Sequence, residues 1–193
     1  MSLRRDLPWP IAPRPFPDEA MGSWFGRLAA RYRMSVMEFA EQNDIKLPKL
    51  QPTVGWLLMP PLANESIDRI AELARLSREK IDAIQTPSEW ITHRWYLSLC
   101  PTCLFLNRED ITAPRWLRDW LAPDFVPCRQ HDAPTITIGT LYFAQCRNFN
   151  DVLRLVGADE IWNAWLDRDR PKHVIRLPKP TRWAERNEFQ LSI

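Results

Sequence analysis

Glycine is scarce in this chain, with five residues among 193. The phosphate-binding loops GxGxxG and GxxxxGKT both need glycines at fixed spacing, and neither pattern occurs. No apolar run approaches the roughly 20 residues of a membrane span, and the N-terminal stretch lacks the apolar region of a secretory signal. The sequence therefore predicts neither a glycine-rich nucleotide loop nor a membrane span, and we expect a cytoplasmic protein.

A strong excess of either charge is also missing, because the net charge is only +2. Residues 1–35 hold six basic and three acidic residues, whereas residues 36–90 hold six basic and nine acidic ones. Proteins that wrap duplex DNA by releasing counterions carry a dense basic surface. We therefore expect any DNA contact to be local, and protein partners to be favoured.

Catalytic metal patterns are equally absent. No HExxH occurs, and no acidic cluster stands out at metal-ligand spacing. An enzyme, such as a nuclease, is therefore poorly supported, and we predict a protein that is not an enzyme.

Proline is abundant, with 18 residues, and five of these stand within residues 1–17. That segment has no helical or strand period, so we expect it to be extended over the protein body. Trp9 and Phe16 are its candidate anchors. Together with Arg14 and Arg31 they are our candidate partner-binding residues, because exposed aromatic and arginine side chains favour interfaces.

Two helices are predicted next. Asp18 is the expected N-cap of an amphipathic helix over residues 19–33, whose apolar positions recur at helical spacing. Ser35 and Glu38 form a capping-box pattern for a helix over residues 36–43. A helix, a short turn and a capped helix are typical of a helix-turn-helix.

The same pattern recurs further along the chain. Asn64 or Ser66 starts one predicted helix, and Ser77 starts the next. On superposition several residues coincide, among them Arg27 with Arg69, Ala29 with Ala71, Arg33 with Arg75 and Ser35 with Ser77. We interpret these as two related helix-turn-helix units. The alternative is a pair of plain αα-hairpins with similar capping residues, and neither second helix carries the arginine, asparagine and glutamine cluster of a base reader.

Two short pairs dominate the second half of the chain: Cys100-x2-Cys103 and, further on, Cys128-x2-His131. Tetrahedral zinc takes thiolate and imidazole ligands, and both pairs have the spacing of a zinc knuckle. We predict a structural Cys3His zinc site, in which four protein ligands leave no open position for catalysis. The alternatives are a redox dithiol, a disulfide and ordinary buried thiols.

The surroundings of these pairs suggest a small zinc-ribbon or zinc-finger module. We expect residues 87–99 to lead in as an edge strand and residues 135–138 to form a strand after His131. Between the pairs, Trp116, Leu117 and Trp120 are expected to pack inside the module, with base stacking as the alternative.

For the last part of the chain, the sequence predicts short helices and a basic tail. Asn150 is the expected N-cap of a helix over residues 151–156 that ends at Gly157. Asp159 is the expected N-cap of a second helix. Residues 172–177 are a candidate strand. From Arg168 on, the tail is mildly basic, and a solvated tail is the favoured interpretation.

Two stretches of the sequence resemble the TniQ family. The first is PRPFPDEAMGSWFGRLA, with Pro15, Pro17, Asp18, Glu19, Ser23, Trp24, Arg27 and Leu28 at the family's positions. The second is the segment that carries Cys-Pro-x-Cys-Leu and Cys-x-x-His. Both stretches follow the family's order and together cover about residues 13–138.

The resemblance implies a target-selection protein of bacterial transposons, a family that includes longer TnsD-like members. Such an adaptor links a target-recognition element, either a DNA sequence or a CRISPR effector with its guide RNA, to a TnsC-like AAA+ transposition regulator. Zn²⁺ is the implied cofactor. The alternative function is a stand-alone zinc-containing helix-turn-helix DNA-binding regulator.

The expected fold is mainly α with a small β part. We predict four segments: an extended proline-rich lead (1–17), two helix-turn-helix-like units (18–92), a zinc-binding module (93–140), and C-terminal helices with a basic tail (141–193).

Overall fold

The computed structural model describes residues 7–105, 114–124, 128, 131 and 135–157. These residues form seven α-helices and a small sheet, so the predicted mainly helical fold with little β structure is confirmed. The elements in chain order are α1 (Met21–Arg31), α2 (Val36–Gln42), the 3-10 turn η1 (Trp56–Leu58), α3 (Asn64–Ala74), α4 (Arg78–Ala83), η2 (Ser88–Trp90), β1 (Tyr96–Leu99), α5 (Pro101–Phe105), η3 (Arg118–Leu121), β2 (Ile136–Gly139), α6 (Thr140–Ala144) and α7 (Phe149–Val156).

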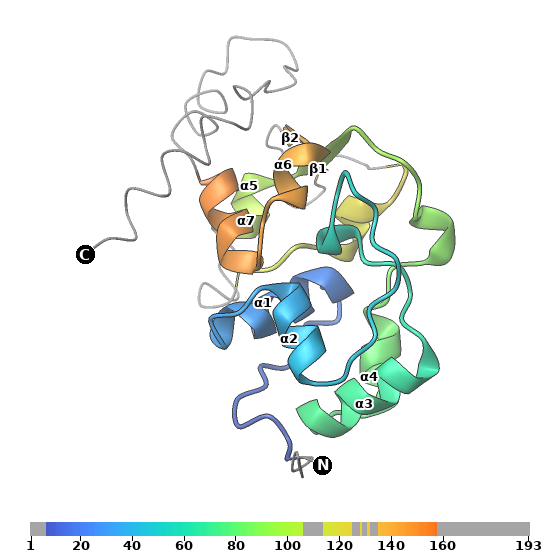
Figure 1. Cartoon of the computed structure of the whole chain (residues 1–193). Coiled ribbons are helices and arrows are strands. Elements are labelled where there is room, and N and C mark those ends of the chain that lie inside the picture. The colour runs from blue at the N-terminus through green and yellow to red at the C-terminus, as the bar shows by residue number, and fades with distance from the viewer. Residues whose placement is uncertain (1–6, 106–113, 125–127, 129–130, 132–134, 158–193) are drawn as a thin grey trace, which may run out of the picture.

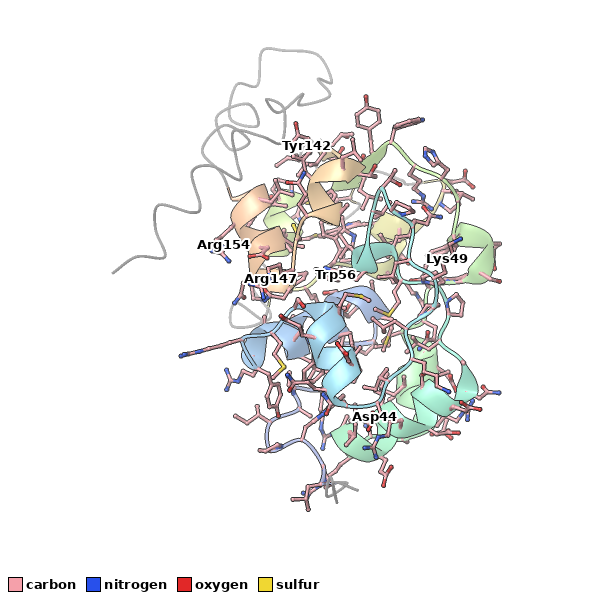
Figure 2. The ribbon with its side chains drawn as sticks, in the orientation of Figure 1. Asp44, Lys49, Trp56, Tyr142, Arg147 and Arg154 are labelled. Atoms are coloured by element: carbon pink, nitrogen blue, oxygen red, sulfur yellow. The ribbon has the colours of Figure 1, made fainter. Side chains whose placement is uncertain are left out.

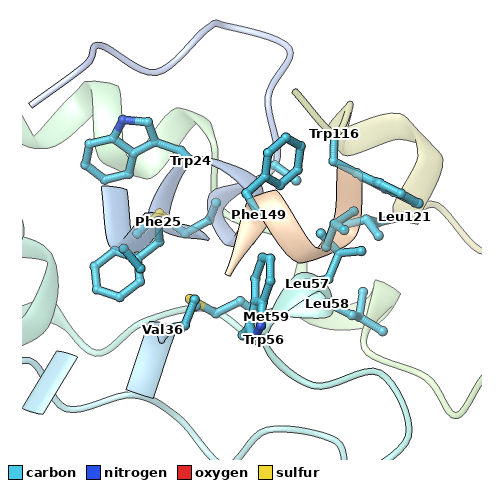
Figure 3. Packing of buried hydrophobic residues seen from close by; sticks show 14 of the residues in the cluster. Trp24, Phe25, Val36, Trp56, Leu57, Leu58, Met59, Trp116, Leu121 and Phe149 are labelled. Carbon is cyan, nitrogen blue, oxygen red and sulfur yellow. The ribbon is translucent and has the colours of Figure 1, made fainter. Parts of the chain in front are cut away.

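Helix α1 lies at the centre of the molecule. It packs against α2, η1 and α7, and Figure 1 shows α1 and α2 between the α3–α4 pair and the half that contains α7 and the sheet. Its apolar side is fully buried, and Figure 3 shows Trp24 and Phe25 among the core side chains. The predicted helix is therefore confirmed, although it is shorter than residues 19–33.

Two glycines let α1 approach η1 closely. A Cβ atom on Gly22 would lie 2.4 Å from the Trp56 carbonyl oxygen, and one on Gly26 would lie 2.5 Å from the Trp56 ring. Trp56 lies in the interior in Figure 2, and its Nε1 donates to the Cys146 carbonyl at 2.6 Å. Glycine is therefore required where α1 meets this tryptophan.

The prediction that Asp18 caps α1 is wrong. The N-cap is Ala20, which makes no side-chain capping bond. Asp18 binds the Arg115 guanidinium instead, with Oδ1 2.9 Å from Nε. The local pattern assigned the Asp18 carboxylate to the helix N-terminus, but this carboxylate pairs with an arginine that is distant in the sequence.

The capping box of α2 is confirmed. The Glu38 backbone N–H donates to the Ser35 hydroxyl at 3.2 Å, and the Ser35 N–H donates to the Glu38 carboxylate at 2.7 Å. The hydrogen bond from the Ser35 backbone lowers the pKa of Glu38. Phe39 and Ala40 face the core, as the pattern predicts.

The two helix pairs end their first helices in the same way. Arg33 and Arg75, which coincide in the sequence repeat, both adopt the left-handed conformation, with φ of 57° and 53°. The residue that follows each arginine closes the same backbone hydrogen bond, from Met34 to Ala29 at 2.9 Å and from Leu76 to Ala71 at 3.0 Å. This pattern is a Schellman motif. The repeat is therefore present in the backbone, whereas a DNA-reading role for either pair stays a prediction.

The described part of the chain contains one antiparallel sheet, formed by β1 and β2. Leu97 pairs with Ile138 and Leu99 with Ile136, and all four side chains are buried. The strand predicted over residues 135–138 is confirmed as β2, which begins and ends one residue later. The lead-in strand spans only Tyr96–Leu99 of the predicted residues 87–99, and residues 88–90 turn as η2.

Helix α7 begins earlier than predicted, and the expectation that Asn150 is its cap is wrong. Asn148 is the N-cap, and its side-chain oxygen accepts the Asn150 backbone N–H at 3.1 Å. The predicted end at Gly157 is confirmed. The helix expected after Asp159, the strand over 172–177 and the basic tail lie outside the described residues.

A single hydrophobic cluster runs from Trp9 to Val156 and includes residues of all four predicted segments. Arg147 lies at the surface just before α7, and Arg154 lies at the surface within α7 (Figure 2). The division of the chain into four domains stays a prediction. None of the described helices is long and apolar enough to cross a membrane.

Candidate metal centre

Four side chains from the two short pairs converge on one point: Cys100, Cys103, Cys128 and His131, here called the Cys3His cluster. One potential ligand atom from each residue lies within 4.8 Å of the other three. Individual separations from His131 Nδ1 are 3.2 Å to Cys103 Sγ, 3.6 Å to Cys128 Sγ and 3.8 Å to Cys100 Sγ. The sequence prediction that these residues come together is thus confirmed.

The sheet explains how the two pairs meet. Leu99, the last residue of β1, pairs with Ile136, the first residue of β2. Cys100 directly follows Leu99, so the antiparallel register brings it toward the chain that precedes β2. Cys103 then lies in α5, where the Leu104 N–H donates to the Cys100 carbonyl at 3.1 Å and closes the turn.

The separations from His131 Nδ1 to the three sulfur atoms, 3.2–3.8 Å, are close to those expected around a tetrahedral metal ion. With metal–sulfur bonds of about 2.3 Å and metal–nitrogen bonds of about 2.0 Å, tetrahedral ligands lie roughly 3.4–3.8 Å apart. Cys103 Sγ and Cys128 Sγ are 3.4 Å apart, which is well beyond the ~2.05 Å of a disulfide. All four cysteines of the chain are free. The cluster could therefore bind a metal ion through four protein ligands.

The thiols of the cluster perturb one another. The pKa of Cys100 is lowered to about 5, first by the hydrogen bond from Cys103, while the pKa of Cys103 is raised by the same contact and by burial. A bound cation would relieve the mutual destabilisation of these thiolates, because metals bind cysteine as thiolate.

Cys146 is separate from the cluster. It is buried, and its Sγ donates to the Tyr142 carbonyl at 3.5 Å. Burial, followed by the charge of Asp151, raises its pKa to about 12. Cys146 is therefore an ordinary buried thiol.

The segment between the two ligand pairs is attached to the start of α1. The Arg118 N–H donates to the Asp18 carbonyl at 2.8 Å, and the Ala20 N–H donates to the Trp116 carbonyl at 2.9 Å. These bonds flank an isolated antiparallel bridge between Glu19 and residue 117. We call the contacts between residues 16–23 and 115–118 the junction.

A buried carboxylate organises the junction. Glu19 is fully buried and accepts bonds from the Ser23 hydroxyl at 2.8 Å and from Arg27 at 2.7 and 2.8 Å. The Ser23 oxygen also accepts the Trp116 backbone N–H at 2.9 Å. Sequence reasoning missed this network. Its signal was a polar residue at every fourth position, 19, 23 and 27, on an otherwise apolar face.

Two tryptophans lie in the core, although they belong to the segment between the two ligand pairs, here called the linking segment. Trp116 and Trp120 are 0% and 4% exposed. Trp116 makes edge-on contacts with Trp120 and with Phe143, each with ring centroids 5.3 Å apart. Figure 3 shows Trp116 among the buried side chains. The packing role is confirmed, and these rings are not available to stack on bases.

The four candidate partner-binding residues lie in different environments. Trp9 is only 8% exposed: it packs on Phe39, and its Nε1 donates to Asn43 at 2.8 Å. It anchors the proline-rich lead, but its ring is not an exposed anchor, because α2 already covers it. Phe16 is half-buried, with the Arg115 guanidinium 4.2 Å from its ring centre. Arg14 and Arg31 are exposed. Partner binding by these residues stays a prediction.

Comparison with known proteins gives one result. The family model described as TniQ matches residues 10–134, which include both the first helices and the metal cluster. No curated protein and no solved structure matches the chain.

Proposed function

The chain belongs to the TniQ family, and from this premise we propose that it is a non-enzymatic adaptor in transposition. Family membership supports a role in the selection of transposition target sites. The proposed adaptor links a target-recognition complex, either a DNA-binding element or a CRISPR effector with guide RNA, to a TnsC-like AAA+ regulator. The observation that carries the proposal is the family match over both halves of the described fold.

Zinc in the Cys3His cluster has a structural role in this proposal. Zn²⁺ would add folding free energy to a segment with a small core of its own. Four protein ligands complete a tetrahedral set, so no position remains for a reacting water. We propose residues 93–140 as the metal module and residues 18–92 as the helical units that it supports.

The proposed partner surface is the exposed part of the proline-rich lead and the end of α1. Arg14 and Arg31 are exposed, and the described residues make no ion pair with either side chain. Arginines without an acidic neighbour favour an acidic surface on the partner. Phe16, two positions after Arg14, adds a half-buried apolar group.

Capture of a cognate TnsC-like AAA+ regulator by the tagged chain tests the proposal. The tagged wild-type chain should retain the regulator. The double variant Arg14→Glu and Arg31→Glu should lose it, because both charges are reversed. Lys80→Glu is the matched control, since Lys80 is an exposed cation on α4, and it should retain the regulator.

The rival function predicts a different result. A stand-alone DNA-binding regulator binds a specific operator without partners, with an affinity that falls steeply as salt increases. Sequence-selective binding by the isolated chain, combined with no capture of the regulator by wild type, would replace the adaptor proposal with this rival.

A further inference from the structure

The junction holds the linking segment near its midpoint. Arg115 stands about midway between Cys103 and Cys128 along the chain. The metal cluster therefore fixes both ends of a segment whose middle is attached to the start of α1. The linking segment therefore connects the metal site to the start of α1.

Side chains strengthen the backbone contacts of the junction. Asp18 accepts two bonds from Arg115, at 2.9 and 3.2 Å. The same guanidinium lies 4.2 Å from the Phe16 ring centre, and Arg27 lies 5.2 Å from it. The Arg115 side chain is 12% exposed, so its charge is largely removed from water and depends on Asp18 for compensation.

We propose that metal binding and attachment of the N-terminal segment are thermodynamically linked through the junction, so that each strengthens the other. A segment fixed at both ends by a metal has fewer conformations, and ordering its middle residues then costs less free energy. Linkage is reciprocal, so the junction must raise metal affinity by the same factor. The linkage rests on the metal site of the proposed function but not on any partner protein.

The linkage gives the metal an influence beyond its own module. Phe16 belongs to the junction, and Arg14 precedes it closely, with its carbonyl accepting a bond from Arg27 at 3.4 Å. Loss of the metal loosens Arg115 and with it the packing of Phe16. The state of the metal site thereby affects the packing of Phe16 at the end of the lead that adjoins the junction, whereas Trp9 anchors the other end on α2.

Zinc affinity of the full-length chain gives the first test, measured by competition with a chromophoric chelator. Asp18→Asn removes the charge opposite Arg115 and should raise the zinc Kd about fivefold, the lower end of typical coupling. Asp68→Asn is the matched control: Asp68 also binds an arginine, Arg78, but on α3, away from the junction. It should leave the Kd unchanged.

The possible failures are distinguishable. Equal zinc affinity of Asp18→Asn and Asp68→Asn overturns the linkage while the metal site stands. No zinc binding by the wild-type chain overturns the metal site and the linkage together. Regulator capture is not part of the measurement, so these outcomes are independent of the partner.

Amide hydrogen exchange of the wild-type chain gives a second test that needs no variant. The N–H groups of Ala20 and Arg118 donate across the junction, so they should exchange about tenfold faster after zinc is removed by a chelator. The amide of Ile70, inside α3, should not change. Unchanged exchange at Ala20 and Arg118, or an equal increase at Ile70, overturns the local linkage.

Discussion

The backbone N–H of Trp116 donates a 2.9 Å hydrogen bond to the Ser23 hydroxyl, across 93 positions of sequence. Ser23 in turn donates to the buried carboxylate of Glu19, which Arg27 neutralises. The polar residues near the N-terminus on which the resemblance to the family rests therefore hold the segment between the metal-ligand pairs. Their role in this fold is to join its two halves.

Removal of Arg27 should destabilise the protein strongly. Arg27→Ala leaves the Glu19 carboxylate buried without a counter-charge, which typically costs about 3 kcal/mol or more. Urea unfolding followed by tryptophan fluorescence measures the loss. Arg78→Ala is the control, because it breaks the partly exposed ion pair with Asp68 and should cost less than about 1 kcal/mol. Similar losses in both variants would contradict the organising role of Glu19.

Substitution of one metal ligand should abolish zinc binding. Cys128→Ser removes a thiolate of the cluster, so the purified variant should contain no stoichiometric zinc by elemental analysis. With zinc at a hundredfold excess over its Kd, the wild type gains about 2.7 kcal/mol of stability that the variant lacks. Cys146→Ala should retain zinc, because Cys146 lies outside the cluster. A zinc-loaded Cys128→Ser protein would refute the ligand assignment.

Gly22, one of the two glycines on the buried side of α1, should tolerate no larger residue. In Gly22→Ala the new methyl group would lie 2.4 Å from the Trp56 carbonyl oxygen and 2.6 Å from that of Leu57. Backbone must move, so we expect a loss of about 2–3 kcal/mol in thermal or chemical unfolding. At Gly139 the nearest atom is a Tyr142 ring carbon at 3.4 Å, and Gly139→Ala should change stability by less than about 0.5 kcal/mol.

Replacement of Arg75 by glycine should stabilise the C-terminal end of α3. Arg75 is exposed and left-handed, with φ of 53°, a conformation that is costly for residues with a Cβ atom. Arg75→Gly should therefore raise the free energy of unfolding by about 0.5–1 kcal/mol. The opposite sign is expected for Lys80→Gly, which places glycine inside α4 and should cost about 1 kcal/mol. Destabilisation by both variants would show that the arginine makes a compensating contact.

Cys146 should make stability depend on pH in the alkaline range. Its pKa is raised to about 12 in the fold from an ordinary value of 9.0, so below pH 9 the thiol is neutral in both states. Between pH 9 and 12 only the unfolded chain ionises it, and the free energy of unfolding falls by up to about 1.4 kcal/mol per pH unit. Cys146→Ala should remove this part of the slope. Identical slopes for the two proteins above pH 9 would contradict the burial of the thiol.

Local features were predictable because their causes are local. The capping box of Ser35 and Glu38 needs only residues three positions apart, and the sequence repeat reappears as two helix ends of the same geometry. The metal cluster was also predictable, because zinc ligands have characteristic spacing along the chain. Asp18 shows where this reasoning fails: as a local signal it resembles a helix cap, but a distant arginine offers it a stronger partner.

The sequence by itself determined the mainly helical fold, the two related helix pairs, the capping box of α2 and the identity of the four metal-ligand candidates, since each depends on spacing within a short stretch. Only the tertiary structure decided that Trp9 is a buried anchor. It also decided that the network of Glu19, Ser23 and Arg27 holds the linking segment. Those roles depend on contacts between residues up to 93 positions apart. Burial in a shared core decides which of several possible partners a polar or aromatic side chain takes.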